Sequence, residues 1–172
     1  MKTMPLLLSL LLFPLLAGAQ PQTFDCEASE AHRQFDFWVG SWEVTDKKGE
    51  KVYGRNNISK REDGCLLLEE YSTGRGFTGS SINYYNPSNG KWHQNWIDNG
   101  SSIILTEGGM EKDSMVLRGT IYYPASKRTA RFRGKWTPLE DGRVRQFFEE
   151  RDGQGKWQTW FDGYYRRIPA PG

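Results

Sequence analysis

The sequence predicts an all-β protein, a single antiparallel up-and-down β-barrel of about ten strands preceded by a short helical or irregular segment. Three observations favour this fold. Short segments of β-prone residues recur along the chain, brief turn sequences rich in Gly, Asp, Asn and Pro separate them, and no long helical periodicity occurs among them. Consecutive hairpins without a crossover connection form a meander, and a meander of this size removes its exposed edges by closing. We therefore expect a barrel rather than a sandwich.

The first residues have the pattern of an export signal. Lys2 precedes an apolar run over residues 6–16, and an A-x-A cleavage sequence ends at Ala19. The run is shorter than the roughly 20 apolar residues that span a bilayer. We therefore expect residues 1–19 to be a signal peptide cleaved before Gln20, and the mature protein to be periplasmic or secreted, without stable membrane insertion.

The mature chain is expected to consist of a lead-in over residues 20–34, helical or irregular, and one barrel domain over residues 35–168. Cys26 and Cys65 are the only cysteines in the sequence. Exported proteins fold in oxidising compartments, where a pair of cysteines commonly forms a bridge. We therefore predict a disulfide that ties the lead-in to a strand of the barrel wall. The alternative is a reactive thiol, which needs a neighbour that stabilises the thiolate, and His32 is the only histidine nearby in the sequence.

An aromatic stretch marks the start of the barrel. Phe35, Phe37, Trp38 and Trp42 lie within eight residues and are interrupted by Gly40. Glycine gives the backbone room to bend. We expect a tight lead-in, such as one helical turn, followed by a bend at Gly40 and the first strand, with Trp42 closing one end of the barrel.

Ten strands are expected in the remaining chain, joined mostly by turns of three to five residues. The Gly-Gly pair at 108–109 is interpreted as one of the breaks, and Asn86–Gly90 is a strong hairpin signal. The expected strands are 41–46, 51–60, 65–72, 77–85, 91–97, 102–106, 114–123, 128–137, 143–150 and 157–166.

Strand alternation predicts which side chains face the barrel interior. In residues 91–97 the two tryptophans select one face as the inner one, and in residues 65–71 the face that holds Glu69 and Tyr71 is favoured. The predicted interior is aromatic with a few polar groups. The residues expected to contact a ligand are Tyr71, Ser81, Asn83, Trp92, Gln94, Trp96, Gln146 and Phe148.

Two interpretations of this polar interior remain open. The polar groups can bond to one another or to trapped water, or they can orient a small ligand between apolar walls. A ten-stranded barrel is wide enough that side chains alone need not fill it. The favoured hypothesis is an exported protein that binds a small, partly apolar molecule.

Two other functions are alternatives to ligand binding. Glu69 is the one candidate catalytic residue, because burial among aromatic rings raises a carboxyl pKa toward the range of a general acid or base. The alternative for Glu69 is a structural carboxylate, paired to an arginine or hydrogen-bonded to Trp or Tyr. A third hypothesis is a filled barrel that binds a partner through its loops. We expect a binding protein more than an enzyme.

Charge and composition argue against other classes of function. The formal net charge is only +2, and the basic residues at 60–61 and 131–135 form local patches, so no nucleic-acid partner is expected. His32 and His93 are the only histidines, and the cysteines lack C-x-x-C spacing, so we expect no metal and no cofactor. The sequence also contains no G-x-S-x-G nucleophile motif.

Gly40-x-Trp42 resembles the G-x-W signature of calycin barrels such as lipocalins. In those proteins a basic residue of the last strand packs over the tryptophan. Arg166 or Arg167 is placed to do so here, and Arg166 is assigned this role. Nitrobindin-type barrels, similar in outline, hold haem through a histidine. Because His93 is predicted to point outward, a haem site is not carried over.

A larger set of motifs resembles a bacterial exported barrel family of unassigned activity. The resemblance covers nearly all of the mature chain, and it implies a calycin-like fold without an established chemistry. The motifs are Phe35-Asp36-Phe37-Trp38-x-Gly40-x-Trp42, Gly64-Cys65, Gly79-x-Ser81, Trp92-x-Gln94-x-Trp96-x-Asp98 and Phe161-Asp162-Gly163.

Overall fold

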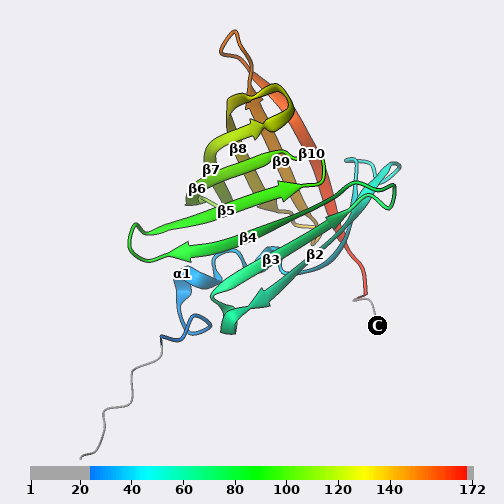
Figure 1. Cartoon of the computed structure of the whole chain (residues 1–172). Coiled ribbons are helices and arrows are strands. Elements are labelled where there is room, and N and C mark those ends of the chain that lie inside the picture. The colour runs from blue at the N-terminus through cyan, green and yellow to red at the C-terminus, as the bar shows by residue number, and fades with distance from the viewer. Residues whose placement is uncertain (1–23, 170–172) are drawn as a thin grey trace, which may run out of the picture.

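The computed structural model describes residues 24–169, which form a closed antiparallel barrel of ten strands with one short α-helix near its N-terminal end (Figure 1). The fold class predicted from the sequence is therefore confirmed. The predicted signal peptide, residues 1–19, lies outside the described residues. None of the described helices is long and apolar enough to cross a membrane.

The lead-in, which in the structure extends over residues 24–39 up to the first strand, contains two short helices. Most of the strands are eight to ten residues long. The helical elements are α1 (Glu30–Arg33) and the 3₁₀ turns η1 (Asp36–Trp38), η2 (Glu62–Gly64) and η3 (Pro124–Ser126). The strands are β1 (Gly40–Thr45), β2 (Val52–Arg61), β3 (Leu66–Ser72), β4 (Thr78–Asn86), β5 (Lys91–Asp98), β6 (Ile103–Glu111), β7 (Ser114–Tyr123), β8 (Arg128–Pro138), β9 (Val144–Arg151) and β10 (Trp157–Arg167).

Each strand pairs with the next one in the sequence, and β1 pairs with β10 to close the barrel. The closing register places Trp42 opposite Arg167 and Thr45 opposite Tyr164. A register shift in β10 between Thr159 and Phe161 changes the alternation of inner and outer side chains near the start of that strand. Because the meander closes, all ten strands have two hydrogen-bonded neighbours.

One predicted break is wrong. Gly108 and Gly109 lie inside β6, and the turn to β7 falls instead at Lys112 and Asp113. A Cβ atom at Gly108 would overlap the backbone carbonyl of Val116 on β7. Gly108 therefore permits a close approach of two paired strands, which the sequence pattern does not distinguish from a turn.

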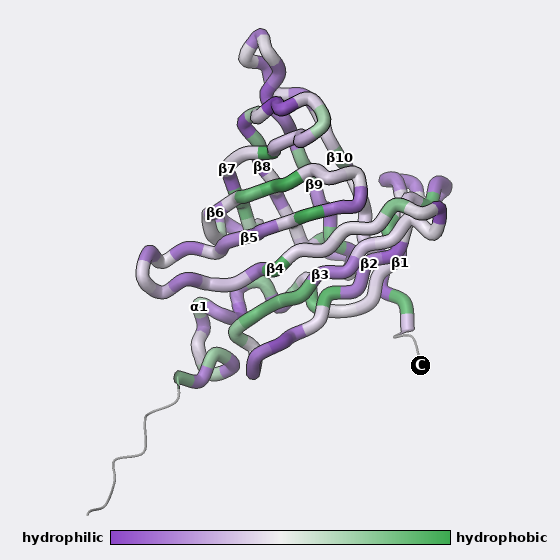
Figure 2. Tube along the Cα trace, in the orientation of Figure 1, coloured by the Kyte–Doolittle hydropathy of each residue, from purple (hydrophilic) through white to green (hydrophobic). Residues whose placement is uncertain are grey.

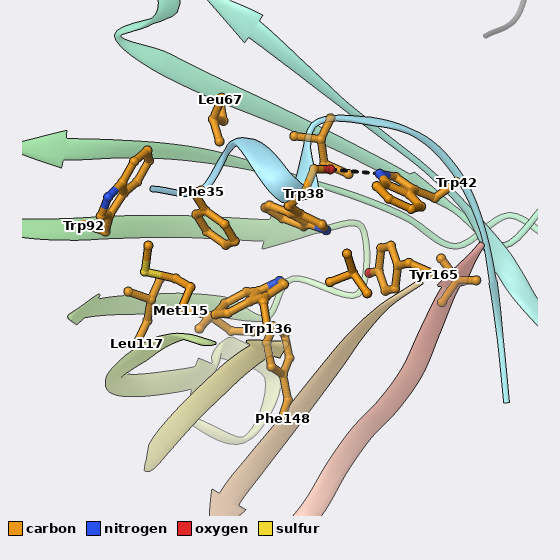
Figure 3. Packing of buried hydrophobic residues seen from close by; sticks show 14 of the residues in the cluster. Phe35, Trp38, Trp42, Leu67, Trp92, Met115, Leu117, Trp136, Phe148 and Tyr165 are labelled. Carbon is orange, nitrogen blue, oxygen red and sulfur yellow. Dashed lines mark hydrogen bonds between the residues drawn. The ribbon is translucent and has the colours of Figure 1, made fainter. Parts of the chain in front are cut away.

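The lead-in fills one end of the barrel with aromatic rings. Phe35 stacks on Trp38 with ring centroids 4.9 Å apart, and it contacts Trp92 and Trp136 edge-on at 5.5 and 5.3 Å. The Trp92 indole also donates a hydrogen bond of 3.1 Å to the Ala31 carbonyl. Figure 3 shows these rings gathered below the lead-in. This half of the interior is a packed core.

Trp42 lies fully buried next to this core. Its indole nitrogen donates to the Trp38 carbonyl at 2.9 Å (Figure 3), and the Arg167 guanidinium lies 4.2 Å from the centre of its ring. Arg166, to which the sequence analysis assigned this contact, instead pairs with Glu43 and is exposed. Successive strand residues face opposite sides, so only one of the two arginines reaches Trp42.

The predicted disulfide is confirmed. Cys26 in the lead-in is bonded to Cys65, the residue before β3, over a sequence separation of 39 residues. The bridge holds the segment before α1 against the wall. Figure 1 shows α1 below β4. The lead-in is thus fixed both covalently and by its buried aromatic rings.

Candidate functional site

The interior of the barrel beyond the lead-in contains a cavity of about 150 Å³. The two tryptophans of β5 mark the division, because Trp92 packs on the lead-in and Trp96, four residues later on the same face, lines the cavity. The lining residues come from β3, the β3–β4 turn, β5, β6, β9 and β10. They are Glu69, Tyr71, Thr73, Phe77, Trp96, Ile104, Gln146, Phe148, Trp160, Phe161 and Tyr165.

Aromatic side chains make up most of the cavity wall. Tyr71 lies 6.5 Å from Trp96 between ring centroids, and Phe148 lies 6.1 Å from Trp160 and 6.2 Å from Phe161. Trp96 fits against the wall because Gly79 faces it from β4, where a Cβ atom would overlap the indole. The lining includes one carboxylate and no lysine, arginine or histidine.

Glu69 is the carboxylate of the cavity and is only 1% exposed. Ser81 on β4 donates a hydrogen bond of 2.5 Å to Glu69 Oε2, and Asn56 Nδ2 on β2 donates one of 2.7 Å to Oε1. The two neighbouring strands therefore hold the carboxylate from both sides. None of the ion pairs among the described residues includes Glu69, so its partners are Asn56 and Ser81 rather than the arginine, Trp or Tyr of the structural alternative.

A chain of polar side chains extends from Glu69 in both directions. On one side, Asn56 Nδ2 also donates to the Tyr165 hydroxyl at 3.1 Å, and Tyr165 donates to Gln146 Oε1. On the other side, Asn83 Nδ2 donates to Ser81 Oγ at 2.8 Å, and Gln94 Nε2 donates to Asn83 Oδ1 at 3.0 Å. Most of the buried polar groups of the interior therefore have partners.

Burial dominates the protonation of this site. Removal from water raises the pKa of Glu69 from 4.5 to about 7, although its bonds to Ser81 and Asn56 act in the opposite direction. Burial, with the Glu69 charge nearby, raises the pKa of Tyr71 to about 12 and that of Tyr165 well above its ordinary value. Near neutral pH the site therefore holds one carboxyl that can gain or lose a proton and two neutral phenols.

The structure divides the ligand-contacting residues expected from the sequence into two groups. Tyr71, Trp96, Gln146 and Phe148 line the cavity. The others lie inside the barrel but away from the cavity surface, in the polar chain or against the lead-in. These are Ser81, Asn83, Gln94 and Trp92.

Sequence reasoning missed several lining residues and one polar partner. Trp160, Phe161 and Tyr165 are contributed by β10, where the register shift and adjacent aromatic residues obscure the alternation. Asn56 lies in a mostly polar stretch of β2, in which Ile58 is the one buried apolar residue. The signal that could have found Asn56 is its spacing of two residues from buried Ile58.

Other chemistry-bearing residues lie elsewhere. His93 stacks on Tyr84 at 5.2 Å, and both side chains alternate with inward-facing neighbours, so His93 lies on the outer face of β5. His32, in α1 of the lead-in, is buried beside Tyr85 of β4, and burial lowers the pKa of His32. Within residues 24–169 no group of His, Cys, Asp and Glu side chains could hold a metal ion.

Sequence comparison gives a family without an assigned activity. Residues 27–167 match the family described as "Protein of unknown function (DUF1579)". The matched region runs from the lead-in to Arg167, the last residue of β10. No curated protein matches the sequence.

Proposed function

The chain belongs to the DUF1579 family, and we propose that it is an exported protein that binds a small, partly apolar molecule in the open half of a calycin-like barrel. The observation that carries this proposal is the cavity of about 150 Å³ between aromatic walls, with Glu69 and Gln146 among its lining. Ligand sites commonly combine mostly apolar walls with a few placed polar groups. An apolar cavity of about 150 Å³ is large enough to bind benzene.

The division of the barrel supports a site rather than an unfilled gap in the core. The lead-in supplies Phe35 and Trp38 to one half, whereas no corresponding segment enters the other half in residues 24–169. Few polar side chains line that half, and Glu69 and Gln146 are the carboxyl and the amide among them. A ligand with an apolar body and one polar group matches this arrangement.

Export and the calycin-like relationship rest on separate features. The Cys26–Cys65 disulfide fits an oxidising compartment, in keeping with the signal-like sequence of residues 1–19. The Arg167–Trp42 contact has the arrangement that the G-x-W resemblance implies, in a barrel closed by β1 and β10. Both features support the proposal of an exported barrel of this type.

A second candidate function is acid–base catalysis by Glu69. The pKa of about 7 is near the value that suits a general acid or base at neutral pH, and the carboxyl lines a cavity that a substrate could enter. Glu69→Gln separates the two functions, because it abolishes turnover in the catalytic case and alters only affinity in the binding case.

Native mass spectrometry of the protein recovered from its exported compartment tests the binding proposal. We expect an excess mass that is lost on denaturation. Ile104→Trp, which fills the cavity, should remove the excess mass, whereas Leu105→Trp, one residue along on the exposed outer face, should retain it. Thr73→Trp at the β3–β4 turn provides a second blocking variant if Ile104→Trp does not fold. A bare mass in the unmodified protein, or an excess mass retained by both blocking variants, would overturn the proposal.

A further inference from the structure

We infer that the cavity accepts a small organic ammonium cation, such as a methylated amine, with aromatic faces around the cationic group and Glu69 as its counter-ion. This inference rests on the proposed binding function and specifies the class of ligand. Three features carry it: the charge of the lining, the arrangement of the rings, and the size of the cavity.

The charge of the lining selects against anions. Glu69 is the only acidic residue in the lining, and the lining contains no lysine or arginine. Arg145 pairs with Asp162 at 2.8 Å and Arg128 pairs with Glu150, whereas Arg75, in the β3–β4 turn, is exposed and lies outside the lining. A carboxylate or phosphate ligand would face the Glu69 carboxylate without a compensating cation in the lining, and like charges repel. A cation would meet the opposite charge.

The rings surround the cavity from different strands. Tyr71 comes from β3, Trp96 from β5, Phe148 from β9, and Trp160 and Phe161 from β10. The face of an aromatic ring carries negative electrostatic potential, and several such faces around one space form the cage that recognises quaternary ammonium groups. Tryptophan is the strongest of these partners, and two tryptophans line this cavity.

The size of the cavity restricts the ligand to a compact group. About 150 Å³ is comparable to the space that holds one benzene molecule, so the cavity surrounds one compact group. The half of the barrel beyond the polar chain cannot extend this space, because Phe35, Trp38 and Trp136 fill it. A short methylated amine is small enough for this volume and does not need to reach into the packed half.

Cation binding must be coupled to the proton on Glu69. The groups that face Glu69 are Asn56 from β2, Ser81 from β4, Tyr71 from its own strand and Tyr165 from β10. The two phenols are neutral below pH 10, and the other two groups do not titrate. An ammonium ligand favours the carboxylate, so binding at low pH releases the Glu69 proton to solvent. Affinity should therefore fall about tenfold per pH unit below the Glu69 pKa and level off above it.

Calorimetric titration of the full mature protein with choline tests this inference. The comparison ligand is dimethylbutanol, a neutral isostere in which carbon replaces the charged nitrogen. At pH 8 we expect choline to bind at least tenfold more tightly than dimethylbutanol. Glu69→Gln should remove this preference, while Glu70→Gln, the exposed neighbour on the opposite face of β3, should retain it. Trp160→Leu, at a partly exposed wall position, should weaken choline more than dimethylbutanol.

The outcomes separate this inference from the binding proposal. Equal affinity for choline and dimethylbutanol, unaffected by Glu69→Gln and by pH, would overturn the cationic ligand and leave the cavity as a neutral binding site. Toluene is titrated in the same way as an apolar probe, and binding of toluene without binding of choline would also overturn the cationic ligand and leave a neutral binding site. Absence of binding for choline, dimethylbutanol and toluene, together with a bare native mass, would overturn both.

Discussion

The Ser81 hydroxyl on β4 donates a hydrogen bond of 2.5 Å to Oε2 of Glu69, its partner across the β3–β4 pair. Asn56 holds the other carboxylate oxygen from β2. The carboxylate is therefore positioned by neutral donors on both sides while its pKa is raised by burial. A group held in this way affects both stability and ligand binding as pH changes.

The first prediction concerns stability and pH. Between pH 4.5 and about 7 the folded protein binds a proton at Glu69 that the unfolded chain has lost, so the free energy of unfolding falls as pH rises through this window and levels off above it. This contribution amounts to about 3 kcal/mol. Urea denaturation across pH 4–9 should show that Glu69→Gln lacks this decrease and that Glu70→Gln keeps it. Identical pH profiles for Glu69→Gln and the unmodified protein would contradict the assignment.

The second prediction concerns barrel closure. Arg167→Gln removes the guanidinium from the Trp42 ring and its 3.0 Å hydrogen bond to the Val39 carbonyl. We expect a loss of about 1–2 kcal/mol in the free energy of unfolding. Arg166→Gln is the matched control, because its exposed pair with Glu43 contributes about 0.5 kcal/mol or less. Equal losses in the two variants, measured by urea denaturation, would show that the Trp42 contact is not stabilising.

The third prediction concerns the disulfide. Closing a loop of 39 residues in the unfolded chain stabilises the fold by about 4 kcal/mol in the chain-entropy model. The double variant Cys26→Ala, Cys65→Ala should show a loss of this order in chemical denaturation. It should also expose the lead-in to proteolysis before the barrel. A double variant as stable as the parent protein would refute the structural role of the bridge.

The fourth prediction concerns the packing of the Trp96 ring against Gly79. Gly79→Ala places a methyl group where the Trp96 indole lies, so the ring must shift. We expect a loss of about 1–3 kcal/mol in stability and weaker ligand binding. Gly109→Ala on β6 is the control, since a Cβ atom there meets no other atom within 4 Å. If both substitutions are tolerated equally in denaturation and titration, the indole is not confined by Gly79.

Alternation along single strands was sufficient to predict much of this interior. Trp92 and Trp96 identify the inner face of β5, and Val144 and Phe148 identify that of β9. The polar residues between them, Gln94 and Gln146, then follow by position. The closed meander also follows from the short hairpin connections, because they leave no segment for a crossover.

The division of the barrel into a packed half and an open half could not be predicted. It depends on how far Phe35 and Trp38 enter the barrel, which is a property of long-range packing rather than of local pattern. The contribution of β10 was obscured for a different reason. Its register shift before Phe161 breaks the period of two. Trp160 and Phe161 therefore both line the cavity, although they are adjacent in sequence.

The central claim is that a small ammonium cation binds in the open half of the barrel, and the indole N–H resonances of the seven tryptophans test it most directly. The measurement is a heteronuclear NMR titration of the mature protein with choline at pH 8. We predict that the signals of Trp96 and Trp160 shift and saturate together, while those of Trp38 and Trp92 in the packed half stay in place. Unchanged Trp96 and Trp160 signals at the highest choline concentration, or shifts confined to exposed Trp157 and the packed half, would contradict the account.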